Sequence, residues 1–394
     1  MKLSERIRSI APSATIAVSA RAAEMKAEGL DVVSFGAGEP DFDTPQFIKD
    51  ATKAALDSGD TKYTPRQGKA LKQAIAEKLQ RENGVQITPE QVVVTFGGKN
   101  ALYKACQVLV DPGDKVLIPA PYWNSYPEMV RLAGGEPVIL HTRREDGFKL
   151  SPGQILDAAG DAKIIILNYP SNPSGASYTR EELAALAEAI LKTDLVVFSD
   201  EIYEKLLFGD AEFVSFSTLD ERLPERTIIF SGLAKTFSMT GWRIGWAAGP
   251  KDVIGAVARL LSHATTHPVS FVQAGALAAY TSPEGPEFAE RMRREFERRA
   301  AHMTERLNAI DGVECVPPAG ALYCFPDVSA HYGRTLGGVE VTDSLSFAKA
   351  ALEAVHVALV PGVAFGEDKC VRLCFAASLE QIDEGLDRLE KLLG

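Results

Sequence analysis

The sequence has little cysteine and no long apolar run. Its five cysteines include no C-x-x-C pair, so a disulfide framework and a zinc ribbon both lack support. Glycine, proline or charge interrupts each apolar run before membrane-spanning length, and the first eleven residues have no apolar signal-peptide core. We therefore expect a cytoplasmic protein without membrane segments, in which the cysteines are reduced core residues.

The sequence also lacks an excess of positive charge. It contains 42 Lys and Arg residues against 53 Asp and Glu residues, a formal net charge of −11 at neutral pH. Nucleic acids and anionic membranes both favour basic surfaces. The charge balance therefore argues against either as a partner.

Several catalytic motifs are missing as well. There is no G-x-G-x-x-G dinucleotide fingerprint, no G-x-S-x-G nucleophile elbow and no H-E-x-x-H pair among the six histidines. These absences argue against a Rossmann-type dehydrogenase, an α/β-hydrolase and a zinc protease. We expect no metal site.

The sequence does contain the alternation of an α/β protein. With 394 residues, 46% of them apolar, it is long enough for a large core in two or three structural units. Between about residues 88 and 250, short β-branched runs alternate with helical patterns, which predicts a parallel sheet covered by helices on both faces. The predicted strands are 92–94, 115–118, 137–140, 164–167, 195–198 and 227–230.

The last hundred residues have a different pattern. A charged helical stretch near 287–308 precedes short strand-like pieces and two more helical patterns, near 345–354 and 379–393. This predicts a second, smaller α+β unit. The strand-like pieces are 312–316, 321–325, 357–360 and 371–375, and a polar stretch at 329–342 resembles an insertion.

Polar residues follow three of the predicted strands. Asn168 and Asn172 come after the strand at 164–167, Asp200 and Tyr203 after 195–198, and Lys235 after 227–230. Ligands of a parallel sheet bind at the carboxyl ends of its strands, so these side chains should converge in one crevice. An amine, a carboxylate and hydrogen-bond donors are what pyridoxal phosphate chemistry needs.

With these motifs, the sequence resembles the class I (fold type I) pyridoxal phosphate aminotransferases, and within them the bacterial aspartate aminotransferase branch. The most specific likeness is the stretch from Gly232 to Gly245, with Lys235 among small residues and the tail Gly241-Trp242-Arg243-Ile244-Gly245. The resemblance runs nearly end to end. It includes 37–42, Tyr63 with Gly68, 97–99, 121–123, 172–175, 200–203 and Arg372.

The resemblance implies a role for each matching cofactor residue. Lys235 would form the Schiff base with pyridoxal 5′-phosphate and act as catalytic acid and base, Asp200 would pair with the ring nitrogen, and Tyr203 and Asn172 would bind the phenolic oxygen. Trp123 would stack on the ring, and Arg243 with the backbone of residues 98–100 would hold the phosphate. The implied catalytic residues are Lys235, Asp200 and Tyr203, and the implied cofactor contacts are Tyr63, Gly98, Lys99, Asn100, Trp123, Asn172, Asp200, Tyr203, Ser231, Lys235 and Arg243.

The resemblance also implies an amino-acid substrate. Arg372 would grip the α-carboxylate as a bidentate partner, helped by Asn172 and the backbone near Gly38. Lys99 is the candidate for a distal carboxylate, against the alternative of a solvated or phosphate-facing lysine at a helix start. The implied substrate contacts are Gly38, Lys99, Trp123, Asn172 and Arg372.

For the fold, the resemblance implies a large cofactor domain with a mostly parallel sheet flanked by helices, and a smaller α+β domain. We expect an N-terminal, substrate-closing arm at 1–14, the large domain at 46–286, and a small domain built from 15–45 and 287–394. Because the family's counterpart of Tyr63 reaches the phosphate of the neighbouring subunit, the resemblance implies a homodimer with shared sites.

The expected reaction is ping-pong transfer of the amino group of L-aspartate to 2-oxoglutarate, which gives oxaloacetate and L-glutamate. Prephenate, aromatic, alanine and kynurenine aminotransferases, and a C–S β-lyase, would keep the cofactor residues and change the distal pocket. A rival of another class is a non-catalytic regulator with an aminotransferase-like body. The lysine signature begins too early to leave room for the DNA-binding module such regulators carry ahead of it.

Overall fold

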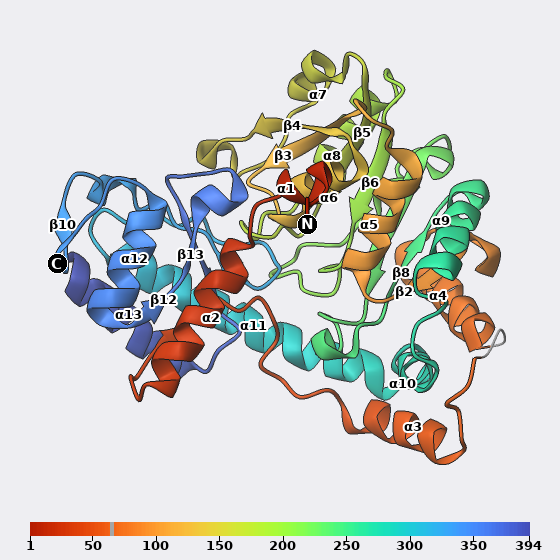
Figure 1. Cartoon of the computed structure of the whole chain (residues 1–394), viewed down its shortest axis with the longest axis horizontal. Coiled ribbons are helices and arrows are strands. Elements are labelled where there is room, and N and C mark those ends of the chain that lie inside the picture. Colours follow the sequence, from red (N-terminus) through yellow and green to blue (C-terminus); the bar gives the residue numbers. More distant parts are fainter. Residues whose placement is uncertain (64–66) are drawn as a thin grey trace.

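The computed structural model describes residues 1–63 and 67–394. A seven-stranded sheet with helices on both faces forms its larger part, and short strands and helices from both ends of the chain form the rest (Figure 1). The helices are α1 (Glu5–Arg8), α2 (Ala14–Ala27), α3 (Gln46–Asp57), α4 (Gln67–Asn83), α5 (Gly98–Leu109), α6 (Ser125–Ala133), α7 (Pro152–Ala159), α8 (Arg180–Ile190), α9 (Lys251–Ala264), α10 (Ser270–Thr281), α11 (Glu284–Ala309), α12 (Ser344–Val355) and α13 (Leu379–Leu393).

The large sheet has the strand order β2-β8-β7-β6-β5-β3-β4. All its strands except β8 run parallel to one another, and β8 is antiparallel to both of its neighbours. The strands are β2 (Val92–Thr95), β3 (Lys115–Ala120), β4 (Glu136–His141), β5 (Ala162–Asn168), β6 (Val196–Asp200), β7 (Thr227–Gly232) and β8 (Gly245–Ala248). The six predicted strands are present, and a mostly parallel sheet is confirmed.

Strand β8 was not predicted. Its sequence is Gly-Trp-Ala-Ala, without the β-branched run that marked the others. It forms because its four residues pair with both β2 and β7, with Gly245 opposite Thr95 on one side and Gly232 on the other. Trp246 is fully buried there. Pairing and burial in the sheet therefore override a weak local strand preference.

The smaller part joins the two ends of the chain. Strand β1 (Val33–Ser34) pairs in parallel with β12 (Val357–Ala358), and helix α2 lies beside α12 and α13 in Figure 1. A second sheet has the order β13 (Val360–Pro361), β14 (Val371–Cys374), β9 (Tyr323–Cys324). The predicted strand at 312–316 is wrong, because Glu314 makes only an isolated bridge to Asp327. The polar stretch 329–342 contains the hairpin of β10 (Thr335–Leu336) and β11 (Val339–Glu340).

Buried apolar side chains from the sheet and the helices form the hydrophobic cores. The five cysteines are free and buried, as predicted.

Capping boxes mark the starts of several helices. The side chains of Ser151, Thr179 and Ser378 each accept a hydrogen bond from a backbone amide of the first helical turn and stabilise that turn. Within the described residues, no helix is long and apolar enough to cross a membrane.

Glycines let the start of α5 approach the sheet closely. Gly97 has φ 89°, a conformation that side chains rarely adopt. A Cβ at Gly245 would lie 2.6 Å from the Gly97 carbonyl carbon and would also meet the Gly98 amide nitrogen. Opposite it, a Cβ at Gly232 would lie 2.9 Å from Gly245 Cα. The first turn of α5 therefore packs against strand backbone, which leaves no space for a methyl group.

Gly245→Ala should destabilise the protein by about 1–3 kcal/mol, since the added methyl would press on backbone that has no room to move. The matched control is Gly255→Ala in α9, where a Cβ would meet nothing within 4 Å and alanine should stabilise the helix by about 0.5–1 kcal/mol. Denaturant unfolding of both variants measures the difference. Equal stability of Gly245→Ala and the parent protein would show that this backbone contact is not tight.

Candidate active site

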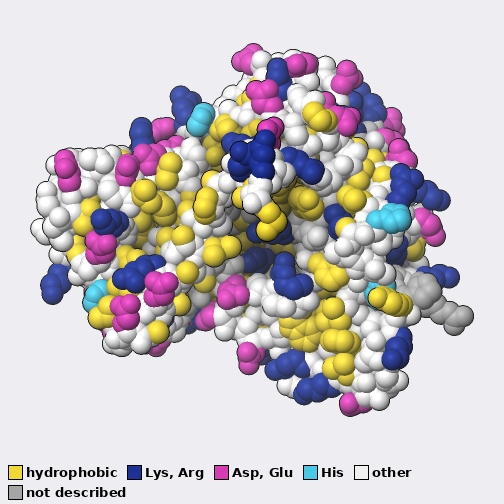
Figure 2. All heavy atoms as spheres, viewed as in Figure 1, with side chains coloured by type: hydrophobic (Ala, Val, Ile, Leu, Met, Phe, Trp, Pro, Cys, Tyr) yellow, Lys and Arg dark blue, Asp and Glu magenta, His cyan; other side chains and the backbone are white. Residues whose placement is uncertain are grey.

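The carboxyl ends of three adjacent strands meet at one cavity. In the sheet β6 lies between β5 and β7, with Asn168 opposite Asp200 and Asp200 opposite Phe230. The cavity has a volume of about 680 Å³. Figure 2 shows the corresponding face, hollowed at its centre, with Lys and Arg side chains beside the hollow. The predicted site residues that line it are Gly38, Gly98, Lys99, Trp123, Asn172, Asp200, Tyr203, Lys235, Arg243 and Arg372.

Lys235 lies on the loop that follows β7. Its Nζ donates to the Gly38 carbonyl oxygen and lies 5.8 Å from the centre of the Tyr203 ring. Burial disfavours the charged ammonium and lowers the pKa of Lys235 to about 8. A substantial fraction of this amine is therefore uncharged and nucleophilic just above neutral pH.

Asp200 ends β6 in a fully buried position. Its Oδ2 accepts a hydrogen bond of 2.6 Å from the Tyr126 hydroxyl, and its Oδ1 accepts one of 3.3 Å from the Ile202 amide. Burial raises the pKa of Asp200 to about 6, while these two bonds act in the opposite direction. Burial also raises the pKa of Tyr126 well above its usual value, so its hydroxyl keeps its proton and remains a donor.

Tyr203 and Arg372 are linked through Tyr323. The hydroxyls of Tyr203 and Tyr323 lie 2.7 Å apart. The guanidinium carbon of Arg372 lies 4.5 Å from the centre of the Tyr323 ring and 5.0 Å from that of Phe365. Two flat rings therefore hold the plane of the guanidinium at the cavity wall.

Arg372 is almost fully buried, yet its hydrogen-bonding capacity is only partly used. Its Nη1 donates to Asn172 Oδ1 at 3.0 Å, and its Nη2 donates to the Gly36 carbonyl oxygen at 2.8 Å. Among the described residues, its Nε has no partner. A buried cation with an unused donor at a cavity is suited to a carboxylate ligand.

The start of α5 and Arg243 give the cavity a second cationic region. Helix α5 begins at Gly98, and amides in a helix's first turn lack carbonyl partners within the helix. The Arg243 guanidinium packs against Gly97, since a Cβ there would lie 3.0 Å from Arg243 Nη2. Arg243 Nη1 also donates to the Thr240 carbonyl oxygen at 2.7 Å. This is an environment for an anionic group.

Lys99 lies near both Arg243 and the Trp123 ring. Its Nζ is 4.7 Å from the centre of the Trp123 ring. Burial lowers the pKa of Lys99, and the nearby Arg243 charge lowers it further. An anion bound beside both cations would relieve this repulsion.

The N-terminal segment covers part of the cavity. Ser13, Thr15 and Ile16 line it. The Asn124 amide donates to Ser13 Oγ at 3.5 Å and to Thr15 Oγ1 at 3.4 Å. Ile16 is 69% exposed, so an apolar side chain lies at the edge of the cavity without being packed.

Three predicted site residues do not line the cavity. Ser231 donates its hydroxyl to the Glu201 carbonyl oxygen at 3.4 Å within the sheet. The backbone N–H of Asn100 donates to the Gly97 carbonyl oxygen at 3.0 Å, and Asn100 lines a neighbouring pocket together with Lys99 and Arg243. Tyr63 is 85% exposed and makes an edge contact with His267.

Sequence reasoning missed Tyr126 and Tyr323, which contact Asp200 and Tyr203. Tyr126 follows Trp123 by three residues and lies in the first turn of α6. That spacing could have placed it near the site, because residues three apart share a helical face. Tyr323 has no comparable signal, since its two-residue strand reaches the cavity only through long-range pairing with β14.

Within the described residues, no group of three or more His, Cys, Asp or Glu side chains is arranged to hold a metal ion. The cavity instead combines an amine of lowered pKa, a buried carboxyl group and two separate cationic regions. Such a set suits a ligand that carries an electrophilic group, a basic ring atom and anionic groups.

Comparison with known proteins agrees with this set of groups. The model of the family "Aminotransferase class I and II" matches residues 30–389. An aspartate aminotransferase of Bacillus subtilis is 47% identical over 100% of this chain and 99% of its own. An aspartate/prephenate aminotransferase of Cereibacter sphaeroides is 46% identical over 98% of each.

Solved structures agree as well. An aspartate aminotransferase from Thermus thermophilus, solved with maleate, superimposes with a TM-score of 0.93 and 42% identity over the full length of both chains. One from Rhizobium meliloti gives a TM-score of 0.94 at 38% identity over 100% of this chain and 99% of that one. The chain has the fold type I architecture and is a member of the class I and II aminotransferases.

Proposed function

We propose that this enzyme is a pyridoxal phosphate-dependent aspartate aminotransferase, which exchanges the amino group between L-aspartate and 2-oxoglutarate in a ping-pong cycle. The observation that carries the proposal is one cavity lined by the amine of Lys235, by Arg372 and by Arg243 with Lys99. Besides burial, the charges of both Arg372 and Arg243 lower the pKa of Lys235. The named activities of the full-length relatives support the choice of aspartate.

The residues fit pyridoxal phosphate. Lys235 offers a buried amine of lowered pKa, Asp200 a buried carboxyl group, and the α5 start with Arg243 an anion site. Gly97 and Gly98 allow close approach to the helix amides. When bound, this cofactor supplies an aldehyde that takes up the amino group and a protonated ring that withdraws electrons from the substrate α-carbon.

In the proposed mechanism, Lys235 Nζ would carry the proton between the substrate α-carbon and C4′ of the bound cofactor, in one direction for the amino donor and in the other for the 2-oxo acid acceptor, so a neutral amine is the required starting form. Asp200 would keep the ring nitrogen of the bound cofactor protonated, and the Tyr126 hydrogen bond favours the ionised form of Asp200. Tyr203 and Asn172 would donate hydrogen bonds to the phenolic oxygen of the cofactor. Trp123 would stack on the cofactor ring and exclude water.

Two cations position the substrate. Arg372 binds the α-carboxylate, and its hydrogen bonds to Asn172 and Gly36 fix the guanidinium fork. Lys99 binds the distal carboxylate. The Thermus relative solved with maleate, a dicarboxylate, supports this pair of contacts.

We further propose that two copies form a homodimer, in which the exposed Tyr63 of each copy reaches the phosphate of the other. An aromatic side chain that is 85% exposed supports an interface there. We also propose that the chain is divided into three parts: an arm at 1–14, a large domain at 46–286 and a small domain built from 15–45 and 287–394.

A second candidate substrate is prephenate, because several relatives of similar identity are named aspartate/prephenate aminotransferases. Steady-state rates with aspartate or glutamate as donor, against 2-oxoglutarate, oxaloacetate and prephenate as acceptors, separate the two activities. Turnover of aspartate with 2-oxoglutarate, without turnover of prephenate, favours the first proposal. Turnover of both 2-oxoglutarate and prephenate as acceptors shows that the enzyme has both activities. Negligible aspartate turnover contradicts the proposal.

Lys235→Ala should lower kcat by at least about 10²–10⁴-fold, since it removes the acid–base group. The variant should keep pyridoxal phosphate non-covalently, because the anion site is untouched. Absorbance spectra and release of cofactor after denaturation measure binding, and borohydride should label Lys235 only in the parent enzyme. Lys349→Ala, at an exposed position of α12, is the control. Near-normal turnover of Lys235→Ala would refute the assigned role.

Arg372→Lys and Lys99→Met should separate the two carboxylate contacts. Arg372→Lys should lower kcat/KM about 10–100-fold for both aspartate and alanine, because each donor has an α-carboxylate. Lys99→Met should lower kcat/KM for aspartate by a similar factor and leave alanine, which lacks a distal carboxylate, nearly unchanged. Equal effects of Lys99→Met on the two donors would assign Lys99 to the cofactor phosphate instead.

Tyr126→Phe should move the acid limb of the kcat/KM profile to higher pH by about one unit. Burial raises the pKa of Asp200 to about 6, and the Tyr126 hydrogen bond opposes that rise. Without the hydroxyl the pKa rises further, so more of Asp200 is protonated and inactive at a given pH. Tyr122→Phe, which keeps the Tyr126 bond, is the control. An unchanged acid limb would show that Asp200 does not set it.

A further inference from the structure

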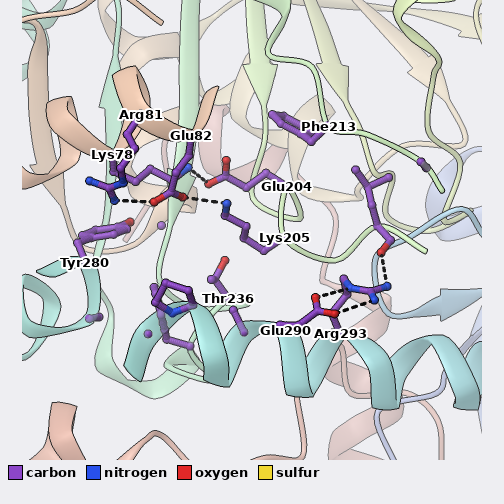
Figure 3. A pocket seen from close by; sticks show the side chains of 18 of the residues that line it. Lys78, Arg81, Glu82, Glu204, Lys205, Phe213, Thr236, Tyr280, Glu290 and Arg293 are labelled. Carbon is purple, nitrogen blue, oxygen red and sulfur yellow. Dashed lines mark hydrogen bonds and ion pairs between the residues drawn. The ribbon is translucent and has the colours of Figure 1, made fainter. Parts of the chain in front are cut away.

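A second cavity lies behind the loop that carries Lys235. It has a volume of about 740 Å³ and shares no lining residue with the active-site cavity. Its walls come from the end of α4, the chain at 204–213, the ends of α10 and α11 that face each other, and the far side of the Lys235 loop (Figure 3). The volume lies within the range of small-molecule binding sites.

One part of this cavity is apolar and aromatic. The side chains of Phe237 and Tyr280, with ring centres 6.0 Å apart, line it together with Ala279, Pro286 and Ala289, whereas Phe213 lies at the other end, beyond Glu204 and Lys205 (Figure 3). Rings of this kind pack best against a flat apolar group. The cavity therefore has room and surface for an aromatic body.

In the polar part of the cavity, the carboxylates already form ion pairs and hydrogen bonds with neighbouring side chains. Glu82 accepts from Arg81 Nη2 at 2.6 Å and from Lys205 Nζ at 2.8 Å. Glu204 pairs with the buried Lys78 and accepts from Asn83 at 2.7 Å. Each carboxylate is thus held by at least one cation or amide.

The third lining carboxylate, Glu290, is neutralised in the same way. It pairs with Arg293 at 2.7 Å. The lining contains four cations, Lys78, Arg81, Lys205 and Arg293, against the three carboxylates Glu82, Glu204 and Glu290. The local charge is therefore positive by one, in a chain whose net charge is −11.

Hydrogen-bond donors, in contrast, remain available. Tyr280 uses its oxygen to accept from Trp246 Nε1 at 2.8 Å, which leaves its hydroxyl proton free to donate. Lys205 and Arg81 each carry further N–H groups beyond those bound to Glu82. In Figure 3 the hydroxyl of Thr236 points into the cavity, and within the described part of the chain it has no hydrogen-bond partner.

From this combination we infer that the second cavity is a binding site for a small aromatic carboxylate. The ring lies beside Phe237 and Tyr280, whose ring centres are 6.0 Å apart, and the carboxylate accepts from Arg81, Lys205 and Tyr280. Charge complementarity selects an anion over a cation of the same shape. An occupant would touch Thr236, which directly follows Lys235, from the side opposite the substrate.

The test uses the holoenzyme with its active-site cavity saturated by maleate, so that only the second cavity is free. Binding of 3-phenylpropanoate and of (3-phenylpropyl)trimethylammonium, whose quaternary nitrogen cannot form a Schiff base with the cofactor, is measured by isothermal titration calorimetry. The carboxylate should bind with one site per chain, and the ammonium ion, which has the same ring and chain length, should bind at least about fivefold more weakly. Equal binding of the two, or no binding of the carboxylate, would overturn the proposal.

Variants locate the site. Ala289→Trp should abolish binding by filling the cavity, whereas Ala301→Trp, at an exposed position of the same helix, should leave it unchanged. The double variant Arg81→Gln, Lys205→Gln should weaken binding about fivefold or more, against no change for Lys192→Gln. Aspartate turnover near that of the parent enzyme shows that each variant is folded. Unchanged binding in both the filled and the charge variants would assign the carboxylate to another place.

Discussion

The adjacency of β5, β6 and β7 is the constraint on which the site depends. Parallel strands bring their carboxyl ends to the same edge, so three loops far apart in sequence meet there. The register sets Asn168 opposite Asp200 and Asp200 opposite Phe230. The loop after Phe230 then carries Lys235 to the same cavity. A slip of one residue in β6 would turn Asp200 to the other face of the sheet and remove it from the site.

Burial at this edge has opposite consequences for the two central groups. It lowers the pKa of Lys235 to about 8 and raises the pKa of Asp200 to about 6. The lowered pKa of Lys235 favours the neutral amine, which is the form that acts as nucleophile and base. The raised pKa of Asp200 favours the neutral acid, although the proposed chemistry needs the carboxylate. The Tyr126 hydroxyl and the Ile202 amide counteract that effect with hydrogen bonds to the two oxygens of Asp200.

Local patterns in the sequence were sufficient to predict the parallel strands and the polar residues Asn172, Asp200, Tyr203 and Lys235 at their carboxyl ends. The remaining predicted residues around the cavity, Gly38, Gly98, Lys99, Trp123, Arg243 and Arg372, came from the resemblance to the aminotransferase family. Buried β-branched runs mark strands, and polar residues at their ends mark the site. Strand β8 and the residues Tyr126 and Tyr323 depend on contacts between distant segments. Gly-Trp-Ala-Ala has no strand pattern until β2 and β7 flank it. The strand predicted at 312–316 is absent for the converse reason, since Glu314 makes only an isolated bridge to Asp327.

The distribution of charge explains how an acidic protein can bind anions. Among the described residues, the active-site cavity is lined by the cations Lys99, Lys235, Arg243 and Arg372 but by only two carboxylates, Glu39 and Asp200. Besides burial, the charge of Arg243 lowers the pKa of Lys99, and the charges of Arg372 and Arg243 lower the pKa of Lys235. Anions that bind beside these side chains reduce the repulsion between them. The net charge of −11 acts at long range and is screened by salt, whereas the cavity charges act within a few ångströms in a region of low dielectric. Local arrangement therefore decides which ligands bind, and the sign of the whole chain does not.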